Sequence, residues 1–335
     1  HAFRAEDGKE LFAYMPRAVA EHVHELASPD YVHRPYVDAE PVVSEAQLLD
    51  SDGELQWRSL LVSGMGGGAQ GVFALDVTDP DTFDAENVLF EFTDQDDVDM
   101  GNVLTPPKLV RLKMAAADAS GRPVYRWFVA VGSGYNNYQD DGHASTDGTQ
   151  AMFLLSLDKS VDEDWNEGTN YFKMKVEAPQ AGMPAALVNP GVAKDVPGNV
   201  ILLYAADTQG NLWRFDLREG LGSGFDTDGA ASRLAVLKDA DDNLQMVTTV
   251  PQVAPGLGQG YMVIVGTGKY LEAGDADMEG GNSVYGILDN LDTEGEAVDR
   301  SMLFGRTFDG STGLTTGGAR FMFGDADGDE TYRGW

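Results

Sequence analysis

The chain has 335 residues, 42% of them apolar, and its 55 acidic and 23 basic side chains give a net charge of −32, so it is long and apolar enough to bury a core. The charge argues against nucleic acid and anionic membranes as partners, and there is no run of about 18 apolar residues that would span a bilayer. The absence of cysteine excludes disulfides, thiolate metal sites and cysteine nucleophiles.

The chain opens on a predicted strand pair in residues 1–16 (HAFRAEDGKELFAYMP), followed by a short amphipathic helix at 16–26 (PRAVAEHVHEL). Four longer units then share one plan: an apolar strand ends in a Gly- or Asp-containing turn, and a second strand returns toward an Asp. A strand that begins with Pro precedes each unit, at a position where no ladder hydrogen bond is lost. The strand pairs occupy 61–77, 127–158, 200–217 and 261–289, and the leading strands begin at Pro41, Pro107, Pro184 and Pro251.

A third strand after the returning one, as at 87–92 (NVLFEF) and 170–176 (NYFKMKV), brings each unit to four strands. Four-stranded units with loop insertions predict an all-β fold, a β-propeller that occupies residues 1–335 as a single domain. A large β-sandwich or a β-helix is the alternative, but neither repeats this order of strands at this length. About five units fit, and the first and last are incomplete. We therefore expect an incomplete ring: either the missing blades lie outside this chain, or the ring closes in an unusual way. We also expect the chain to be a fragment of a longer precursor.

Several long strings, in order along nearly the whole chain, resemble the C-terminal propeller of the PilY1/PilC family of type IV pilus biogenesis and tip-adhesin proteins. They include HAFRAEDGKELFAYMPRAV, GMGGGAQGVFALDVTDP, YAADTQGNLWRFDL and MVIVGTGKYLE. The resemblance implies a modified propeller of the quinoprotein type, extracellular or on the cell surface, at the pilus tip or outer membrane. It implies roles in pilus assembly, in opposing retraction and in attachment, with minor pilins and host or abiotic surfaces as partners.

The chain departs from this family at the calcium loop that members often carry before the strand containing Tyr204. The corresponding residues 188–199 offer only Asn189 and Asp195 as oxygen donors, and Lys194 would repel a cation. This loop is therefore degenerate as a Ca²⁺ site, and an RGD tripeptide found in some members is absent.

The remaining calcium candidate is Asp325, Asp327 and Asp329, which take positions 1, 3 and 5 of a calcium loop. The match ends there, because Glu330 stands where the sharp turn needs Gly and position 12 lies past the end of the sequence. A solvated acidic turn is the alternative interpretation. Other acid-rich stretches, at 94–99, 226–229 and 239–243, are interpreted as surface or turn carboxylates.

Inserted loops are the expected contact surfaces, since rigid blades hold them in place. The insert at 135–150 begins with Tyr135, Asn136, Asn137 and Tyr138, which we predict to bind a partner; a solvated loop is the alternative. Gly64–Gly68 is read as a tight turn and not as a phosphate loop, because a strand follows it. His22 and His24 lack a third zinc ligand. The five tryptophans are predicted to pack between blades, namely Trp57, Trp127, Trp165, Trp213 and Trp335.

Two functions from different classes fit these features. The first is a non-enzymatic pilus-associated interaction protein. The second is a quinone-dependent dehydrogenase on the same propeller, since AFRAEDGKELF resembles the blade-docking motif of that superfamily. The scarcity of Lys and the even spread of acids resemble proteins of halophilic organisms, in which salt screens self-repulsion.

Overall fold

The computed structural model describes most of the chain. The described residues are 1–50, 52–139, 143–177, 185–256, 260–277, 281–291, 296–303, 305, 307–309, 314–316 and 333–335.

Four antiparallel sheets form successive blades, as the repeats predict, and each sheet follows the order of its strands along the chain. Blade 1 consists of β3 (Val42–Leu49), β4 (Leu55–Gly64), β5 (Gly71–Asp76) and β6 (Val88–Thr93); blade 2 of β7 (Lys108–Ala117), β8 (Pro123–Gly132), β9 (Ala151–Ser156) and β10 (Tyr171–Lys175); blade 3 of β11 (Gly191–Lys194), β12 (Val200–Ala206), β13 (Asn211–Asp216) and β14 (Ala231–Val236); and blade 4 of β15 (Gln252–Pro255), β16 (Tyr261–Gly266) and β17 (Val284–Asp289).

The remaining elements are short and lie at the two ends of the chain or in connections. They are β1 (Ala2–Phe3), β2 (Glu10–Phe12), α1 (Arg17–Ala20), the 3-10 helices η1 (Val23–Ala27), η2 (Ala85–Asn87), η3 (Ala273–Asp277) and η4 (Arg300–Met302), and the pair β18 (Thr307–Asp309) and β19 (Leu314–Thr316). The helix predicted at 16–26 is thus one turn of α-helix and one 3-10 segment. Its N-cap residue Pro16 makes no side-chain cap, and Pro16 and Val19 are the two buried residues of 16–26, so little stabilises a longer helix.

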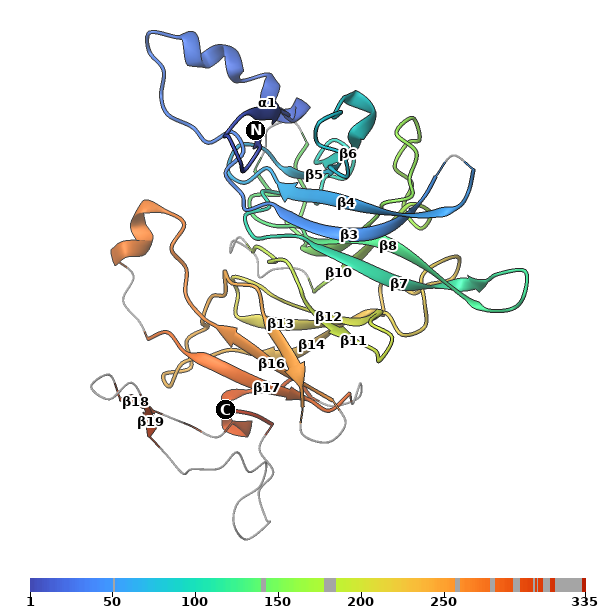
Figure 1. The fold of residues 1–335 in the computed structure, drawn as a ribbon. Coiled ribbons are helices and arrows are strands. Elements are labelled where there is room, and N and C mark those ends of the chain that lie inside the picture. The colour runs from blue at the N-terminus through green and yellow to red at the C-terminus, as the bar shows by residue number, and fades with distance from the viewer. Residues whose placement is uncertain are drawn as a thin grey trace.

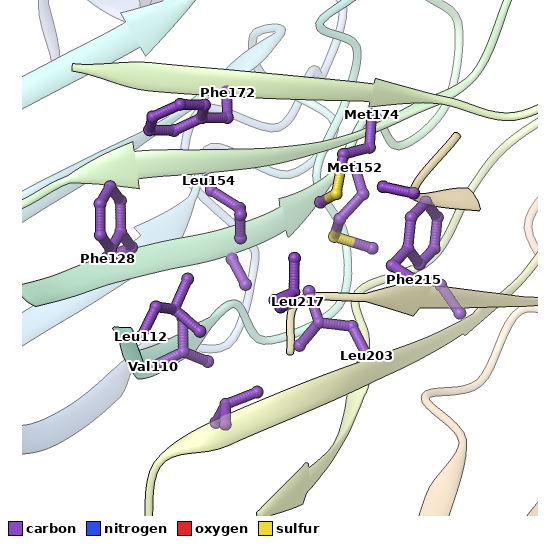
Figure 2. Packing of buried hydrophobic residues seen from close by; sticks show 14 of the residues in the cluster. Val110, Leu112, Phe128, Met152, Leu154, Phe172, Met174, Leu203, Phe215 and Leu217 are labelled. Carbon is purple, nitrogen blue, oxygen red and sulfur yellow. The ribbon is translucent and has the colours of Figure 1, made fainter. Parts of the chain in front are cut away.

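The blades stack face to face in an arc, with the N-terminus beyond blade 1 and the C-terminus beside blade 4 (Figure 1). One apolar cluster fills each space between neighbouring blades. Figure 2 shows the cluster between blades 2 and 3, where Met152 and Met174 of blade 2 lie beside Phe215 of blade 3. Burying each such side chain contributes about 1.5–3 kcal/mol, so these faces account for much of the fold's stability.

Blade 1 has a second covered face, which packs against the N-terminal segment. Phe73 and Leu75 of β5 form a cluster there with Phe12, Tyr14 and Ala18. The predicted strand pair of residues 1–16 is therefore present as β1 and β2, in a two-stranded sheet of its own that lies beside blade 1.

Blade 4 contains three strands, and the C-terminal residues add to its outer edge. The N–H and C=O of Trp335 exchange hydrogen bonds with Gly286 over 2.9 and 2.7 Å, and the Leu288 N–H donates to Arg333 O over 2.8 Å. The Trp335 ring lies against Gly286, where any side chain would collide with it. The arc of four blades is consistent with an incomplete ring.

Three short segments between blades link the ends of neighbouring blades by backbone bridges. Asn102 bridges Gly71 of blade 1 and Tyr135 beside blade 2, and Leu187 bridges Gly134 and Asp207 in the same way for blades 2 and 3. Val247 donates to Asp207 O over 3.2 Å and bridges Gly268 of blade 4.

This arrangement corrects one prediction. The leading strand of blade 3 was expected to begin at Pro184, but it is β11, which begins at Gly191. The segment before it, around Leu187 and Val188, crosses from blade to blade, because its N–H groups bond to Gln150 Oε1 and Ala206 O. The other leading strands, β3, β7 and β15, begin directly after Pro41, Pro107 and Pro251, as predicted.

Many carboxylates are used in a recurring five-residue turn. Its first residue is an Asp whose Oδ1 accepts from the backbone N–H four residues later, and its fourth residue has a positive φ. Such turns occupy 118–122, 195–199, 207–211 and 239–243. Asp favours these positions because its short side chain bonds nearby N–H groups. The acidic residues at these positions therefore stabilise turns, as predicted for 239–243.

Candidate partner-binding surface

Backbone bridges through Asn102, Leu187 and Val247 link the connections between the second and third strands of neighbouring blades, so these connections lie at the same end of the stack. This end carries the long insert between β8 and β9, the glycine-rich turn between β4 and β5, and the segment between β16 and β17 that includes η3. We call it the insert end.

The predicted contact residues lie at the insert end but differ in accessibility. Tyr138 is 42% exposed, whereas Asn137 is fully buried. The Asn137 Nδ2 group donates to Asp99 O and Thr149 O over 3.1 and 2.9 Å, and its Oδ1 accepts from Gln150. Asn137 therefore holds the base of the insert together.

The other two residues also take part in holding the insert. Tyr135 exchanges backbone hydrogen bonds with Asn102, and burial raises the pKa of its hydroxyl well above the ordinary value of 10.0. Asn136 adopts a left-handed backbone with φ of 62°, and its Nδ2 donates to Asn102 Oδ1 over 3.1 Å. Of the four predicted residues, Tyr138 is thus the one whose side chain is best placed to contact a partner.

Further exposed apolar side chains of the insert end lie in the segment after β16 of blade 4. Part burial and the negative charge of Glu272 in that segment raise the pKa of Tyr138. Tyr270 and Leu271 of that segment are both exposed. Tyr138, Tyr270 and Leu271 are thus exposed apolar side chains on two loops of the insert end, and we call these three residues together the aromatic patch.

Two carboxylates of the acidic stretch at 94–99, those of Asp97 and Asp99, pair with a lysine of blade 2. The Lys173 ammonium lies 2.8 Å from an Asp97 carboxylate oxygen and 3.1 Å from one of Asp99. Tyr171 and Ser145 donate to the same two carboxylates. Burial opposes the charge on Lys173, but the hydrogen bonds and charges of Asp97 and Asp99 outweigh it and raise the pKa of the lysine. A lysine therefore occupies the space between these carboxylates.

The cavity at the insert end has a volume of about 710 Å³ and lies between the N-terminal segment and blade 1. The walls are α1 with His22, the loop residue Arg34, the turn at Gly67–Gln70, the residues around Glu91 and Asp96, and the insert at Gln139 and His143. Glu91 fixes the helical wall, because its carboxylate accepts from the Arg17 N–H over 2.9 Å and from the Tyr14 hydroxyl.

The glycine-rich turn that forms one wall is explained by close packing. A side chain at Gly68 would lie 1.8 Å from Tyr36 O, and one at Gly67 would meet Pro35. The Gly67 N–H also donates to Asp38 Oδ1 over 2.8 Å. The turn has glycines because the segment around Tyr36 passes directly over it, which agrees with its interpretation as a tight turn.

The structure describes one of the two stretches considered as calcium sites and not the other. Asp325, Asp327 and Asp329 lie outside the described residues, so they remain a prediction. In the degenerate loop before Tyr204, Asn189 bonds to Thr105 O and the Gly132 N–H, and Asp195 bonds to Asn199. These side chains are therefore engaged in hydrogen bonds within the protein. In the described part of the chain, no three of His, Asp and Glu gather to hold a metal ion.

The tryptophan prediction is confirmed for some positions and wrong for one. Trp213 is buried between blades, and Trp165 stacks edge-on against Phe90 and Phe92. Trp57 is instead 59% exposed on the long β3–β4 hairpin, where it contacts the edge of Trp127. The Trp127 ring of the neighbouring blade therefore covers only part of the Trp57 side chain.

Sequence reasoning missed the residues that build the cavity. Gln70, Glu91 and Asn102 are separated in the sequence and their spacing matches no known binding-site pattern, and the structure brings them together through the turns at the insert end. The glycine-rich string was a signal of close packing there, but it did not show which segment packs against it.

Comparison with known proteins shows which family and which proteins this chain resembles. Residues 1–304 match the model of the PilY1 beta-propeller domain family. A "Type IV pilus biogenesis factor PilY1 homolog" of Xylella fastidiosa is 33% identical over 313 residues, which cover 87% of this chain and 18% of the relative. The "Type IV pilus biogenesis factor PilY1" of Pseudomonas aeruginosa strain UCBPP-PA14 is 32% identical over 350 residues, covering 95% of this chain and 27% of the relative.

The crystal structure of the Pseudomonas aeruginosa PilY1 C-terminal domain superposes with a TM-score of 0.68 and 27% sequence identity. It aligns with 99% of this chain, which covers 67% of that structure. The chain therefore spans a minor part of the curated relatives. Among the described residues, the helices are all too short or too polar to cross a membrane.

Proposed function

The chain belongs to the PilY1 beta-propeller family of type IV pilus biogenesis proteins, and from this premise we propose that it is a non-enzymatic interaction protein at the cell surface that supports pilus assembly, opposes retraction and mediates surface attachment. The match over residues 1–304 carries this proposal. Minor pilins and the surface to which the pilus attaches are the proposed partners.

The architecture supports contact through the insert end. Inter-blade clusters and backbone bridges hold the blades rigidly, and the aromatic patch projects from loops at this end. Aromatic side chains supply much of the binding energy at protein interfaces, because they bury large areas at little cost in conformational entropy. Tyr138 and Tyr270 are therefore the side chains we expect to contact a partner.

The test uses the full-length protein in its own pilated host, from which the parent gene is deleted. Complementation with the parent should restore surface pili and attachment. A Tyr138→Ala/Tyr270→Ala variant should restore pili less well, or restore pili without attachment. Val196→Ala, which changes a fully exposed residue on the distant β11–β12 turn, is the matched control. Full pilation and attachment by the double variant would exclude the aromatic patch, and normal pili in the deletion strain would contradict the pilus role.

The non-enzymatic part of the proposal has its own test. The purified chain is mixed with a quinone cofactor and Ca²⁺, and dye reduction is followed with alcohols or aldose sugars. We expect the rate to equal that of the mixture without protein. Turnover above this background would favour the dehydrogenase alternative instead.

A further inference from the structure

The β7–β8 hairpin of blade 2 is cationic, although the molecule as a whole is strongly acidic. Residues 108–126 of this hairpin contain five of the 23 basic side chains and one of the 55 acidic ones, so they carry a net charge of +4. An even distribution of charged residues along the chain would place about three acids and about one base in a stretch of this length. The cations are Lys108, Arg111, Lys113, Arg122 and Arg126.

Most of these cations are not used in ion pairs within the protein. Arg126 lies 3.3 Å from a carboxylate oxygen of Asp158, whereas the other four form no ion pair with any residue that the structure describes. The one acid of the hairpin, Asp118, accepts from two backbone N–H groups of the turn at its tip. Lys113 and Arg122 are exposed, so their charges are accessible to carboxylates from outside.

Aromatic rings share a face of the hairpin with two of the cations. Lys113 and Arg111 stand directly opposite Tyr125 and Trp127 across the two strands, and side chains opposite each other in an antiparallel pair lie on the same face. The guanidinium carbon of Arg111 lies 4.6 Å from the centre of the Tyr125 ring. Trp127 in turn meets the exposed Trp57 of β4 edge-on, with ring centres 6.5 Å apart. These five residues extend over blades 1 and 2, and we call them the cationic hairpin face.

This face is held in place by blade 3. The Ala115 N–H donates to Leu221 O over 2.7 Å, and the Leu221 N–H donates to Lys113 O over 2.9 Å. Arg111 Nη1 donates to Asn199 Oδ1 over 3.0 Å. A surface that is already ordered loses little conformational entropy on binding. Because β8 leads to the insert end, the β7–β8 turn lies at the opposite end of blade 2 (Figure 1).

The composition of the face indicates what kind of partner fits it. Trp, Tyr and Arg are the side chains that contribute most to binding at protein interfaces, and a cationic surface favours anionic partners. The adjacent β3–β4 turn carries Asp52 and Glu54, so the cations are confined to the side of blade 2. A long polyanion would extend past this face onto a molecule of net charge −32, which repels it. A short anionic segment with an apolar group is therefore favoured.

We propose that the cationic hairpin face binds a short acidic segment of a partner protein, whose carboxylates pair with Lys113 and Arg111 and whose apolar side chain covers Trp57. The guanidinium group has five donors in a plane, and one of them is bonded to Asn199, so Arg111 can also hold a carboxylate. This inference is independent of the pilus role and of the aromatic patch at the insert end.

The test measures binding of a synthetic ten-residue peptide, as long as β7, to the 335-residue chain by calorimetry or NMR titration at about 0.15 M salt. The peptide has Leu at its two central positions and Glu at all others. Its matched probe has Gln in place of every Glu, which keeps the shape and removes the charge. We expect the Glu peptide to bind about tenfold more tightly or better. Equal affinities for the two peptides, or no binding of either, would overturn the proposal.

Variants assign the binding to the hairpin. Lys113→Glu reverses one exposed charge and should weaken binding of the Glu peptide about tenfold. Trp57→Ala should also weaken it, because the apolar contact is lost. Lys9→Glu makes the same charge change on an exposed residue between β1 and β2 and is the matched control, and thermal melting shows whether each variant is folded. An equal loss in Lys9→Glu, or no loss in a folded Lys113→Glu or Trp57→Ala protein, would contradict the assigned site.

A second copy of this acidic chain is the competing occupant of the face. Sedimentation of the parent and of Lys113→Glu without peptide separates the two cases. We expect the two proteins to sediment alike, since the proposed segment belongs to another protein. Self-association of the parent that Lys113→Glu abolishes would assign the face to a second copy and refute the proposed partner.

Discussion

Asp289 is the residue whose removal should most weaken the contact between blades 3 and 4. Its carboxylate is fully buried and accepts hydrogen bonds from the Tyr204 hydroxyl over 2.7 Å, the Arg214 guanidinium over 3.0 Å and the Leu291 N–H over 2.8 Å. Tyr204 and Arg214 belong to blade 3, whereas Asp289 ends β17 of blade 4. The network therefore joins the two blades by charge as well as by apolar packing.

The Asp289→Ala variant would leave the buried Arg214 charge without this carboxylate. Breaking a buried ion pair from one side typically costs about 3–5 kcal/mol, because the desolvated charge stays behind. An unfolding entropy of about 2.1 cal/mol/K per residue converts this to a decrease of about 4–7 °C in melting temperature for a chain of this length. Tyr204→Phe removes one hydrogen bond and should cost about 0.5–1.5 kcal/mol.

The assay is urea denaturation followed by tryptophan fluorescence and circular dichroism, with melting temperatures from calorimetry. The double variant Arg214→Met/Asp289→Leu is the informative control, since replacing both charges with apolar groups removes the unbalanced charge. It should recover at least part of the stability lost in Asp289→Ala. If Asp289→Ala unfolds at the parent's urea concentration and temperature, or if the double variant is no more stable than it, the reasoning about this ion pair is refuted.

Three further predictions concern salt, calcium and pH. The melting temperature should rise markedly between low salt and about 1 M NaCl, because screening reduces repulsion among the excess carboxylates; a flat response would exclude salt adaptation. If Asp325, Asp327 and Asp329 bind Ca²⁺, millimolar Ca²⁺ should raise the melting temperature and Asp327→Ala should abolish the rise, whereas equal melting in Ca²⁺ and chelator would exclude the site. Hydrogen bonds from the side chain and backbone N–H of Asn243 hold the pKa of Asp239 below its usual value. The ionised Asp239 carboxylate therefore stabilises the folded protein at pH values above its unfolded pKa of about 4, and this contribution is lost as the pH falls through the lower pKa of the folded state. Asp239→Asn should therefore melt below the parent at pH 7 and converge with it at the lowest pH; a constant difference across pH would contradict this.

Residue patterns alone predicted the blades because their causes are local. The alternation of apolar residues, the prolines before leading strands and the returning strands with Phe73, Phe153 and Phe215 follow from strand geometry and the need to bury one face against a neighbour. The turn at 239–243 was predictable for the same reason, since Asp239 bonds to N–H groups within four residues of itself.

Contacts between distant residues could not be predicted in this way. Lys173 lies between Asp97 and Asp99 only because β10 passes the end of β6, and no spacing in the sequence encodes that meeting. The same holds for Trp57 and Trp213, which look alike in the sequence. Trp57 lies near the end of the β3–β4 hairpin and stays exposed, whereas Trp213 is buried between two blades.

The sequence by itself determined the family, the order of the strands and the use of many carboxylates in turns, because each depends on residues close together in the chain. The tertiary structure alone decided which members of the predicted contact loop are free. The Asn137 side chain is buried and donates hydrogen bonds to two backbone carbonyls, whereas Tyr138 remains exposed. It also decided that Gln70 and Asp96 share one cavity, because only the stacking of blades and the passage of the N-terminal segment over them bring those side chains together.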